Sequence, residues 1–118
     1  METWGGGLVP VNRVGESGLA EFAYQFAWDT EKALANRIKH GVAFELAATV
    51  FRDALALSQY DEDHSEDEER WITIGMAETG ELLLVVHTFE ELSAQESLIR
   101  IISAREPDRQ ERLDYEGR

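Results

Sequence analysis

Alternating and helically spaced hydrophobic residues divide the chain into elements. Between Phe22 and Trp28 every second residue is aromatic, which predicts a strand with one aromatic face. Asp29 follows in the position of a helix N-cap. The helix is expected to run to His40, because Gly41 suits the left-handed residue that ends many helices. This region therefore predicts a strand followed directly by a helix.

The hydrophobic positions also predict which helix faces are buried. Leu34 and Ile38 stand one turn apart and are predicted to form the core face of the first helix. A second helix is predicted over residues 43–52, where apolar residues recur at i, i+3, i+4 and i+7. That stripe comprises Phe44, Ala47, Ala48 and Phe51.

Apolar runs dominate the second half of the chain. Gly80 marks a hairpin turn, the run LLLVVHT is expected in the centre of a sheet, and residues 89–96 are expected to form a polar connection. A last helix is predicted, with Pro107 in its first turn and its end near Gly117. Strands are predicted at residues 55–59, 70–76, 82–88 and 98–104.

This order predicts the α+β class: an N-terminal strand, two helices, an antiparallel meander of about four strands and a C-terminal helix. Residues 22–118 are expected to form a single domain. Residues 1–21 are rich in glycine and are expected to be a flexible extension. No signal peptide or membrane span is predicted, and the protein is expected to be cytoplasmic.

The charge distribution narrows the range of functions. The 118 residues include 24 acids and 11 bases, for a formal charge of −13. Seven of the acids lie between Asp61 and Glu69. The average charge argues against non-specific binding to nucleic acid or to an anionic membrane. Because cysteine is absent, disulfides, thiolate zinc sites and cysteine nucleophiles are excluded.

Basic residues form two candidate groups. On the predicted first helix, one stripe opposite Leu34 and Ile38 carries an amide, an imidazole and two ammonium groups, which indicates either a phosphate site or a solvated face. These residues are Lys32, Asn36, Lys39 and His40. The strands carry Arg70, Arg100 and Arg105. Arg100 interrupts an apolar strand, so its guanidinium requires either a carboxylate partner or a phosphate.

The histidines suggest three different environments. His40 and His87 are candidates for proton transfer, although His87 at the end of a buried strand also fits a hydrogen-bonded core residue. His64 lies within the acidic run, where a divalent metal site is a weak alternative to a solvated loop. The sequence contains no dinucleotide fingerprint, phosphate-binding glycine loop or GxSxG elbow.

Four segments in this order resemble the BrnT family of bacterial toxins. They are FAWDTEKALANRIKHGVAF, YDEDHSEDEERWITIGM, LLVVHT and IRIISAREPDRQERLDYE. The resemblance covers residues 22–116. It rests most strongly on two patterns that occur together, one from Asn36 to Phe44 and one from His64 to Arg70.

The resemblance implies a RelE/ParE-like fold and metal-independent RNA cleavage without a cofactor. It also implies a BrnA-like ribbon-helix-helix antitoxin as the partner, with DNA contacted only through that antitoxin. For such a toxin, the 2′-hydroxyl attacks the adjacent phosphate and basic side chains stabilise the phosphorane. The expected catalytic residues are Lys39, His40, Arg70, His87, Arg100 and Arg105.

Two other functions compete with this prediction. One is a catalytically weak or inactive interaction protein of the same fold, whose acidic surface binds a basic partner. The other is a metal-assisted hydrolase built on His64 and its neighbouring carboxylates. The ribonuclease prediction requires the cations to converge, so a structure that separates them or pairs each with its own carboxylate would argue against it.

Overall fold

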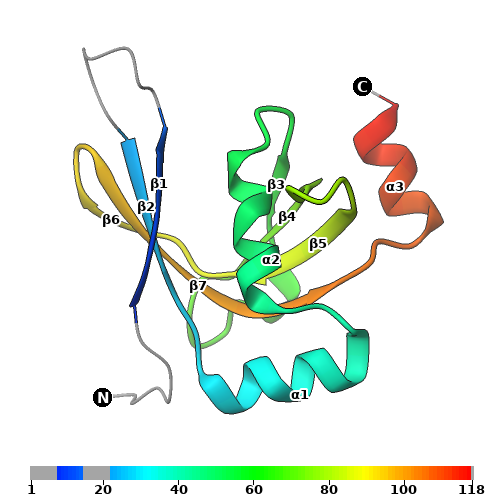
Figure 1. The fold of residues 1–118 in the computed structure, drawn as a ribbon, viewed down its shortest axis with the longest axis horizontal. Coiled ribbons are helices and arrows are strands. Elements are labelled where there is room, and N and C mark those ends of the chain that lie inside the picture. The colour runs from blue at the N-terminus through cyan, green and yellow to red at the C-terminus, as the bar shows by residue number, and fades with distance from the viewer. Residues whose placement is uncertain (1–7, 15–21, 118) are drawn as a thin grey trace.

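Seven strands form one mixed sheet in the computed structural model, which describes residues 8–14 and 22–117 (Figure 1). The strands are β1 (Leu8–Val14), β2 (Phe22–Ala27), β3 (Leu57–Tyr60), β4 (Trp71–Met76), β5 (Leu82–His87), β6 (Glu90–Ser93) and β7 (Glu96–Arg105). The helices are α1 (Thr30–His40), α2 (Phe44–Ala48) and α3 (Arg109–Glu116), with 3₁₀ turns η1 (Thr49–Arg52) and η2 (Glu62–His64).

Strand β7 organises the sheet, whose order is β1-β2-β7-β5-β4-β3. The first half of β7 lies between β2, which is parallel to it, and β6, which is antiparallel. Its second half pairs with β5. The predicted α+β class is confirmed, and β3, β4, β5 and β7 are the expected antiparallel neighbours. The parallel pairing of β2 with β7 was not predicted.

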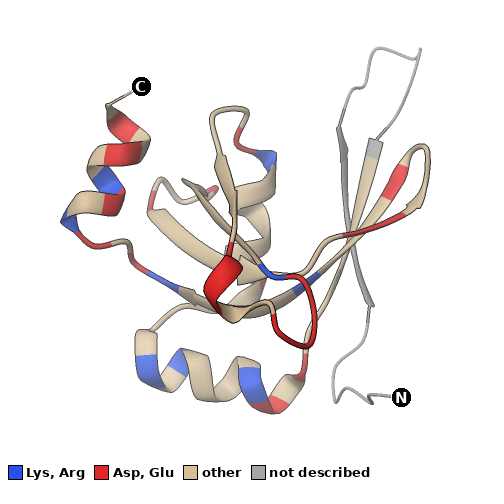
Figure 2. Ribbon diagram, turned by 180° about the vertical axis from the view of Figure 1, so that it is seen from behind, with Lys and Arg blue, Asp and Glu red and all other residues tan. Residues whose placement is uncertain are grey.

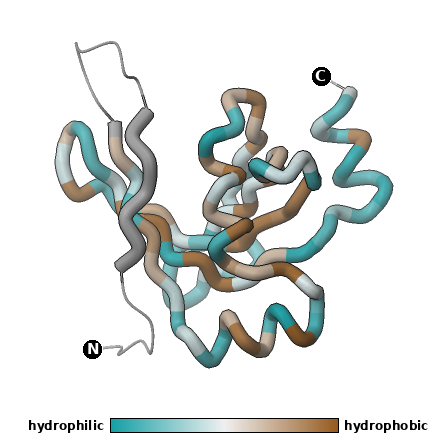
Figure 3. Tube along the Cα trace, viewed as in Figure 1, coloured by the Kyte–Doolittle hydropathy of each residue, from teal (hydrophilic) through white to brown (hydrophobic). Residues whose placement is uncertain are grey.

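The main core lies between the sheet and α2. Phe44 of α2 packs at a ring-centroid distance of 6.0 Å from Trp28, and Phe51 of η1 lies 5.4 Å from Phe26. The predicted stripe on residues 43–52 therefore faces the core, although this segment divides into α2 and η1. Figure 3 shows the matching hydrophobic stretches along β5 and β7, which run through the middle of the sheet.

The opposite face of the sheet carries a smaller core and the acidic loop. Ile74, Leu82 and Leu84 form a second cluster, against which Tyr115 of α3 packs. The Tyr115 hydroxyl donates a hydrogen bond to Asp53, with an oxygen–oxygen distance of 2.5 Å. Figure 2 shows the acidic segment between β3 and β4 in front of the sheet on this side, whereas α2 lies behind it.

Helix α1 has the predicted ends but not the predicted buried face. The Asp29 carboxylate accepts hydrogen bonds from the first turn, and Gly41 adopts a φ of 73° at the C-cap. However, Leu34 is 63% exposed and Ile38 is 79% exposed, while Asn36 is buried. The prediction that Leu34 and Ile38 form the core face was therefore wrong.

The hydrogen bonds of Asn36 give the physical reason. Strand β2 stops pairing with β7 at Ala27–Arg100, so the backbone of Ala104 has no strand beside it on that edge. The Asn36 amide takes the place of a strand: its Nδ2 donates to the Ala104 oxygen at 2.8 Å, and its Oδ1 accepts from the Ala104 nitrogen at 3.1 Å. Nδ2 also donates to the Val42 oxygen at 3.1 Å. A buried polar edge thus selects an amide rather than a leucine.

Three other boundaries differ from expectation. Residues 8–14, within the predicted extension, form β1 and pair with β2, while residues 1–7 and 15–21 lie outside the described residues. The predicted polar connection at 89–96 contains β6, which pairs with β7. Helix α3 begins after its N-cap Asp108, so Pro107 precedes the helix.

Candidate functional site

Two arginines from different elements meet at one carboxylate. Arg100 lies on β7 and Arg70 directly precedes β4, and Glu68 of the acidic loop forms an ion pair with both. The Glu68 Oε1 atom lies 3.7 Å from Arg70 Nη2, and Oε2 accepts a hydrogen bond from Arg100 Nη2. The Arg100 side chain is only 8% exposed. Of the two partners expected for Arg100, a carboxylate or a phosphate, the structure shows the carboxylate.

Local hydrogen bonds fix the base of the acidic loop. The Asp61 nitrogen donates to the Arg70 oxygen at 2.9 Å, and the Arg70 nitrogen donates to Ser65 Oγ at 3.0 Å. Ser65 Oγ in turn donates to the Asp61 oxygen. These bonds hold residues 61, 65 and 70 together. The tip of the loop, residues 66–69, is attached to the sheet through the Glu68 carboxylate.

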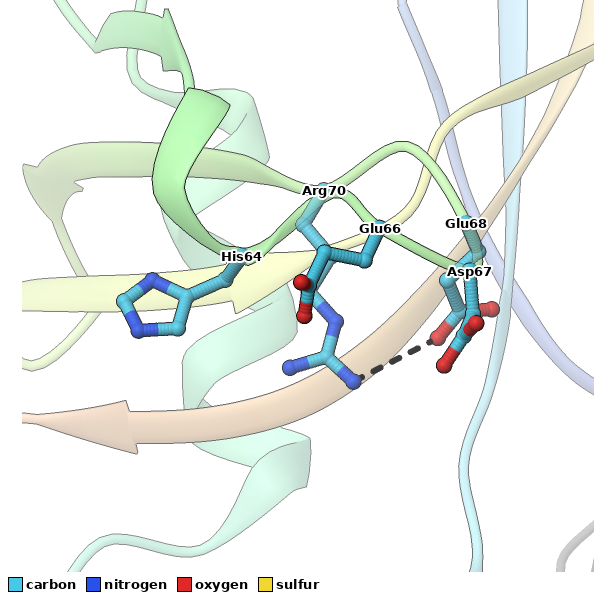
Figure 4. Close-up of a pocket in the computed structure, with 5 residues that line it drawn as sticks. All are labelled: His64, Glu66, Asp67, Glu68 and Arg70. Atoms are coloured by element: carbon cyan, nitrogen blue, oxygen red, sulfur yellow. Dashed lines mark ion pairs between the residues drawn. The ribbon is translucent and has the colours of Figure 1, made fainter.

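A pocket of about 150 Å³ opens beside this ion pair (Figure 4). It is lined by His64, Glu66, Asp67, Glu68 and Arg70. Figure 4 shows Arg70 reaching toward Glu68, with His64 on the other side of the arginine. The Arg70 Nε atom is buried and has no hydrogen-bond partner within the described residues. The pocket is therefore lined by an arginine whose hydrogen-bonding capacity is incompletely used.

His64 does not form a recognisable metal site. Its Nδ1 lies 3.0 Å from an Asp61 carboxylate oxygen on an exposed part of the loop. Within residues 8–14 and 22–117, no three histidine, aspartate or glutamate side chains are grouped so that they could hold a metal ion. The metal-assisted alternative gains no geometric support from this loop.

Arg105 belongs to a different cluster. It lies further along β7, on the order of 15 Å from Arg100 at about 3.3 Å per residue. Its guanidinium binds both carboxylate oxygens of Glu111 in α3, at 2.9 and 3.0 Å. This hydrogen bonding raises the pKa of Arg105 and lowers the pKa of Glu111. Arg105 therefore helps to hold α3 and is not brought to the Glu68 pair.

Helix α1 carries cations of a different kind. Within the described part of the chain, no carboxylate forms an ion pair with Lys32, Arg37 or Lys39, and all three are exposed. His40 is half-buried at the end of the helix. Of the predicted stripe, Asn36 alone is buried, and it is committed to the backbone of β7. Lys39 and His40 remain available to a ligand at the surface of α1.

His87 is part of the core. It is 3% exposed, its ring packs edge-on against Phe51, and both ring nitrogens are hydrogen-bonded. Nδ1 donates to the Thr88 oxygen at 2.9 Å, so Nε2 accepts from the Thr73 hydroxyl at 2.7 Å. Burial lowers the pKa of His87 to about 4. His87 therefore fits the structural alternative and is not placed to transfer a proton to a substrate.

The arrangement of these residues can be compared with known proteins. A sequence model described as "Ribonuclease toxin, BrnT, of type II toxin-antitoxin system" matches residues 28–111, well over half of the chain. The chain belongs to the BrnT family. A comparison with curated proteins finds no match. The type II toxin–antitoxin family implies an RNA substrate and an antitoxin partner.

Of the six predicted site residues, only Arg70 and Arg100 are brought together, so the expected convergence of the cations is limited to this pair. The matched region includes α1, the acidic loop and β7, and it contains every predicted site residue. Arg70 and Arg100 meet, Lys39 and His40 lie on the surface of α1, and Arg105 and His87 have structural contacts.

None of the helices that the structure describes is long and apolar enough to span a membrane.

Sequence reasoning missed two residues of this BrnT chain and placed a third in the wrong environment. Glu68 was one acid among the seven of the loop, and only the three-dimensional contact singles it out. Arg37 lay outside the predicted stripe, but it is exposed on α1. Asn36 was placed on a stripe interpreted as either a phosphate site or a solvated face, whereas it is bound to the β7 edge. The uninterrupted apolar surroundings of Arg100 were the signal for a buried anionic partner.

Proposed function

We propose that this protein is a metal-independent endoribonuclease that is neutralised by a ribbon-helix-helix antitoxin. One observation carries the proposal: Arg70 and Arg100, from different elements, converge on a single anionic group. Two guanidiniums around one carboxylate are also a suitable arrangement for an RNA phosphodiester, which likewise presents two anionic oxygens and gains further negative charge in the phosphorane. Family membership supports RNA as the source of that phosphate.

The proposed reaction uses the RNA 2′-hydroxyl as the nucleophile. Its oxygen forms a bond to the neighbouring phosphorus, and the bond from phosphorus to the 5′-oxygen breaks, leaving a 2′,3′-cyclic phosphate. Arg70 and Arg100 stabilise the additional negative charge of the phosphorane. His40 is proposed to accept the proton of the 2′-hydroxyl, and the departing 5′-oxygen gains a proton as it leaves. Lys39 is proposed as a further phosphate contact, because both residues are accessible on α1.

A cleavage assay tests this proposal directly. The purified chain is incubated with single-stranded RNA in EDTA, and the products are examined for cyclic phosphate ends. Cleavage is expected for the unaltered protein and is expected to fall by about 10²-fold or more for Arg100→Ala, since a preorganised charge is lost. Lys39→Ala tests the contribution of the helix.

Folding controls make the result decisive. Circular dichroism establishes that each variant is folded, because Arg100→Ala also removes a partner of Glu68. Cleavage that is unchanged by both substitutions would contradict the proposed site. Cleavage that depends on a divalent ion would contradict the metal-independent mechanism.

A second candidate function is a non-catalytic protein that binds a basic partner. The observation that favours it is the exposed acidic loop, in which Glu62, Asp63, Glu66, Asp67 and Glu69 all face solvent. Co-expression with the neighbouring small reading frame separates the two functions. A partner that binds tightly, together with a chain that cleaves no RNA in its absence, would favour this second function.

A further inference from the structure

Glu68 occupies the place where the proposed function requires a phosphate. We infer that the tip of the acidic loop, residues 66–69, is a built-in latch that closes the Arg70–Arg100 anion site in the free protein. The inference rests on the proposed function for the identity of the ligand as RNA. The closure itself rests on the contacts of Glu68.

The burial of Arg100 supports a closed state. Its side chain is 8% exposed and its Nη2 is bound to Glu68, whose own side chain is 32% exposed. A phosphate that approaches from solvent therefore meets the Glu68 carboxylate before the Arg100 guanidinium. Displacement of Glu68 is required before both arginines can contact the same phosphate.

The construction of the loop makes such a displacement local. The base is fixed by hydrogen bonds among Asp61, Ser65 and Arg70. Among the described residues, the tip makes no hydrogen bond or ion pair to the sheet other than those of Glu68. Outward movement of residues 66–69 therefore breaks two ionic contacts and leaves the base in place.

The geometry also explains why a phosphate can compete with Glu68. One of the two contacts is long, at 3.7 Å between Oε1 and Arg70 Nη2, and the Arg70 Nε has no partner among the described residues. Glu68 thus engages only part of the hydrogen-bond donor capacity of Arg70. A phosphodiester also presents two anionic oxygens, and because it is not attached to the loop it can place one at hydrogen-bonding distance from each guanidinium.

The loop provides a matched control for a test. Glu68→Gln and Glu69→Gln remove the same charge from adjacent positions, but only Glu68 touches the arginines, since Glu69 is exposed and forms no described ion pair. The probe is a fluorescent 2′-O-methyl RNA oligonucleotide, which carries phosphates but lacks the attacking hydroxyl. Its affinity is measured by anisotropy at fixed salt.

Glu68→Gln is expected to bind the probe about tenfold more tightly than the unaltered chain, as for a latch that is closed about nine-tenths of the time. Glu69→Gln is expected to change the affinity less than about threefold, through long-range charge alone. In an Arg100→Ala background the advantage of Glu68→Gln should disappear. Equal affinities for Glu68→Gln and Glu69→Gln, or weaker binding by Glu68→Gln, would overturn the latch.

Two further measurements keep the test independent of folding and of catalysis. If Glu68→Gln does not fold, Glu68→Asp replaces it: the charge is kept, but the shorter side chain cannot reach both arginines. Probe binding at least threefold tighter is then expected, and unchanged binding overturns the latch. If no variant cleaves ordinary RNA but the difference in binding persists, the ribonuclease proposal fails and the latch stands.

Discussion

Helix α1 and the arginines of the sheet present positive charge in opposite ways. Lys32, Arg37 and Lys39 extend into solvent without carboxylate partners among the described residues. Arg70 and Arg100 share Glu68, and Arg105 is bound by Glu111. The helix therefore offers charge that is ready for an approaching polyanion. The sheet holds charge that is accurately positioned but already neutralised.

This difference separates two tasks in a protein with a charge of −13. Solvated lysines attract a nucleic acid over distance, but they are poorly fixed and strongly screened. Arginines held by carboxylates are fixed, and Arg100 is also largely removed from solvent, which is what stabilisation of a developing charge requires. An overall anionic protein can thus retain a local site for phosphate.

The largest expected effect is a difference in RNA cleavage between loss of an arginine of the sheet and loss of a lysine of α1. Arg70→Ala is expected to lower kcat/KM for RNA by about 10²-fold, because a positioned donor to the transition state is removed. Lys39→Ala is expected to lower it by about tenfold or less, as for the loss of one phosphate contact. Cleavage of a labelled oligonucleotide in EDTA measures both. Equal losses of kcat/KM in the two variants would show that the arginines of the sheet and the lysine of α1 do not differ in their contribution to catalysis.

The second prediction concerns the anchor of α1. Asn36→Ala is expected to lower the free energy of unfolding by about 3 kcal/mol, because three buried hydrogen-bonding groups lose their partner. Ile38→Ala on the same helix is expected to cost less than about 0.5 kcal/mol, since Ile38 is 79% exposed. Urea unfolding measures both variants. A larger cost for Ile38→Ala would show that α1 packs through its apolar face.

The buried His87 is expected to make the stability of the protein depend on pH. Since the folded pKa of His87 is about 4, below the unfolded value near 6.5, the unfolded chain binds the extra proton between these values. Protonation of His87 in the unfolded chain should therefore reduce the free energy of unfolding as pH falls from about 6.5 to 4, by about 3 kcal/mol in total.

His87→Gln is expected to lose that contribution, so the difference in stability between the variant and the unaltered chain should shrink toward pH 4. Urea unfolding at several pH values measures it. Cleavage by the folded variant at neutral pH should stay within about threefold of normal, because the ring does not reach substrate. A loss of cleavage activity comparable to that of Arg70→Ala would show that His87 takes part in catalysis.

The smallest effect concerns binding at a distance. Arg37→Ala is expected to reduce the slope of log affinity against log salt by about 0.7 for single-stranded RNA, as for one fewer neutralised phosphate. The rate at saturating RNA should be unchanged. Titration of the 2′-O-methyl oligonucleotide at several salt concentrations measures the slope. An unchanged slope would exclude this part of α1 from the RNA path.

Much of the fold could be predicted because its signals are local. Asp29 and Gly41 mark the ends of α1 through hydrogen bonding and backbone conformation, and Gly80 marks the hairpin with a φ of 89°. The apolar run of β5 identifies a central strand because both of its faces are buried. Strands β1 and β6 could not be predicted, because they are defined by pairing with β2 and β7 rather than by a hydrophobic pattern.

The site was harder to predict because it depends on contacts between distant segments. The position of Arg100 within an apolar strand predicted either a carboxylate or a phosphate partner, and the structure shows the carboxylate of Glu68. Nothing in the acidic run distinguishes Glu68 from its neighbours, since the loop must fold before one carboxylate reaches two arginines. Similarly, the burial of Asn36 follows from where β2 ends, which the helical spacing around it cannot show.

The amide of Asn36 also blocks strand pairing along the edge of β7 beyond β2. An unpaired strand edge can template an extended segment of another molecule, and such addition is a common route to aggregation. Beyond β2, the outward N–H and C=O groups of Ala104 are hydrogen-bonded to the Asn36 side chain of α1. No further strand can therefore pair with β7 at this position. The same contact that orients α1 therefore protects β7 from recruitment by other chains.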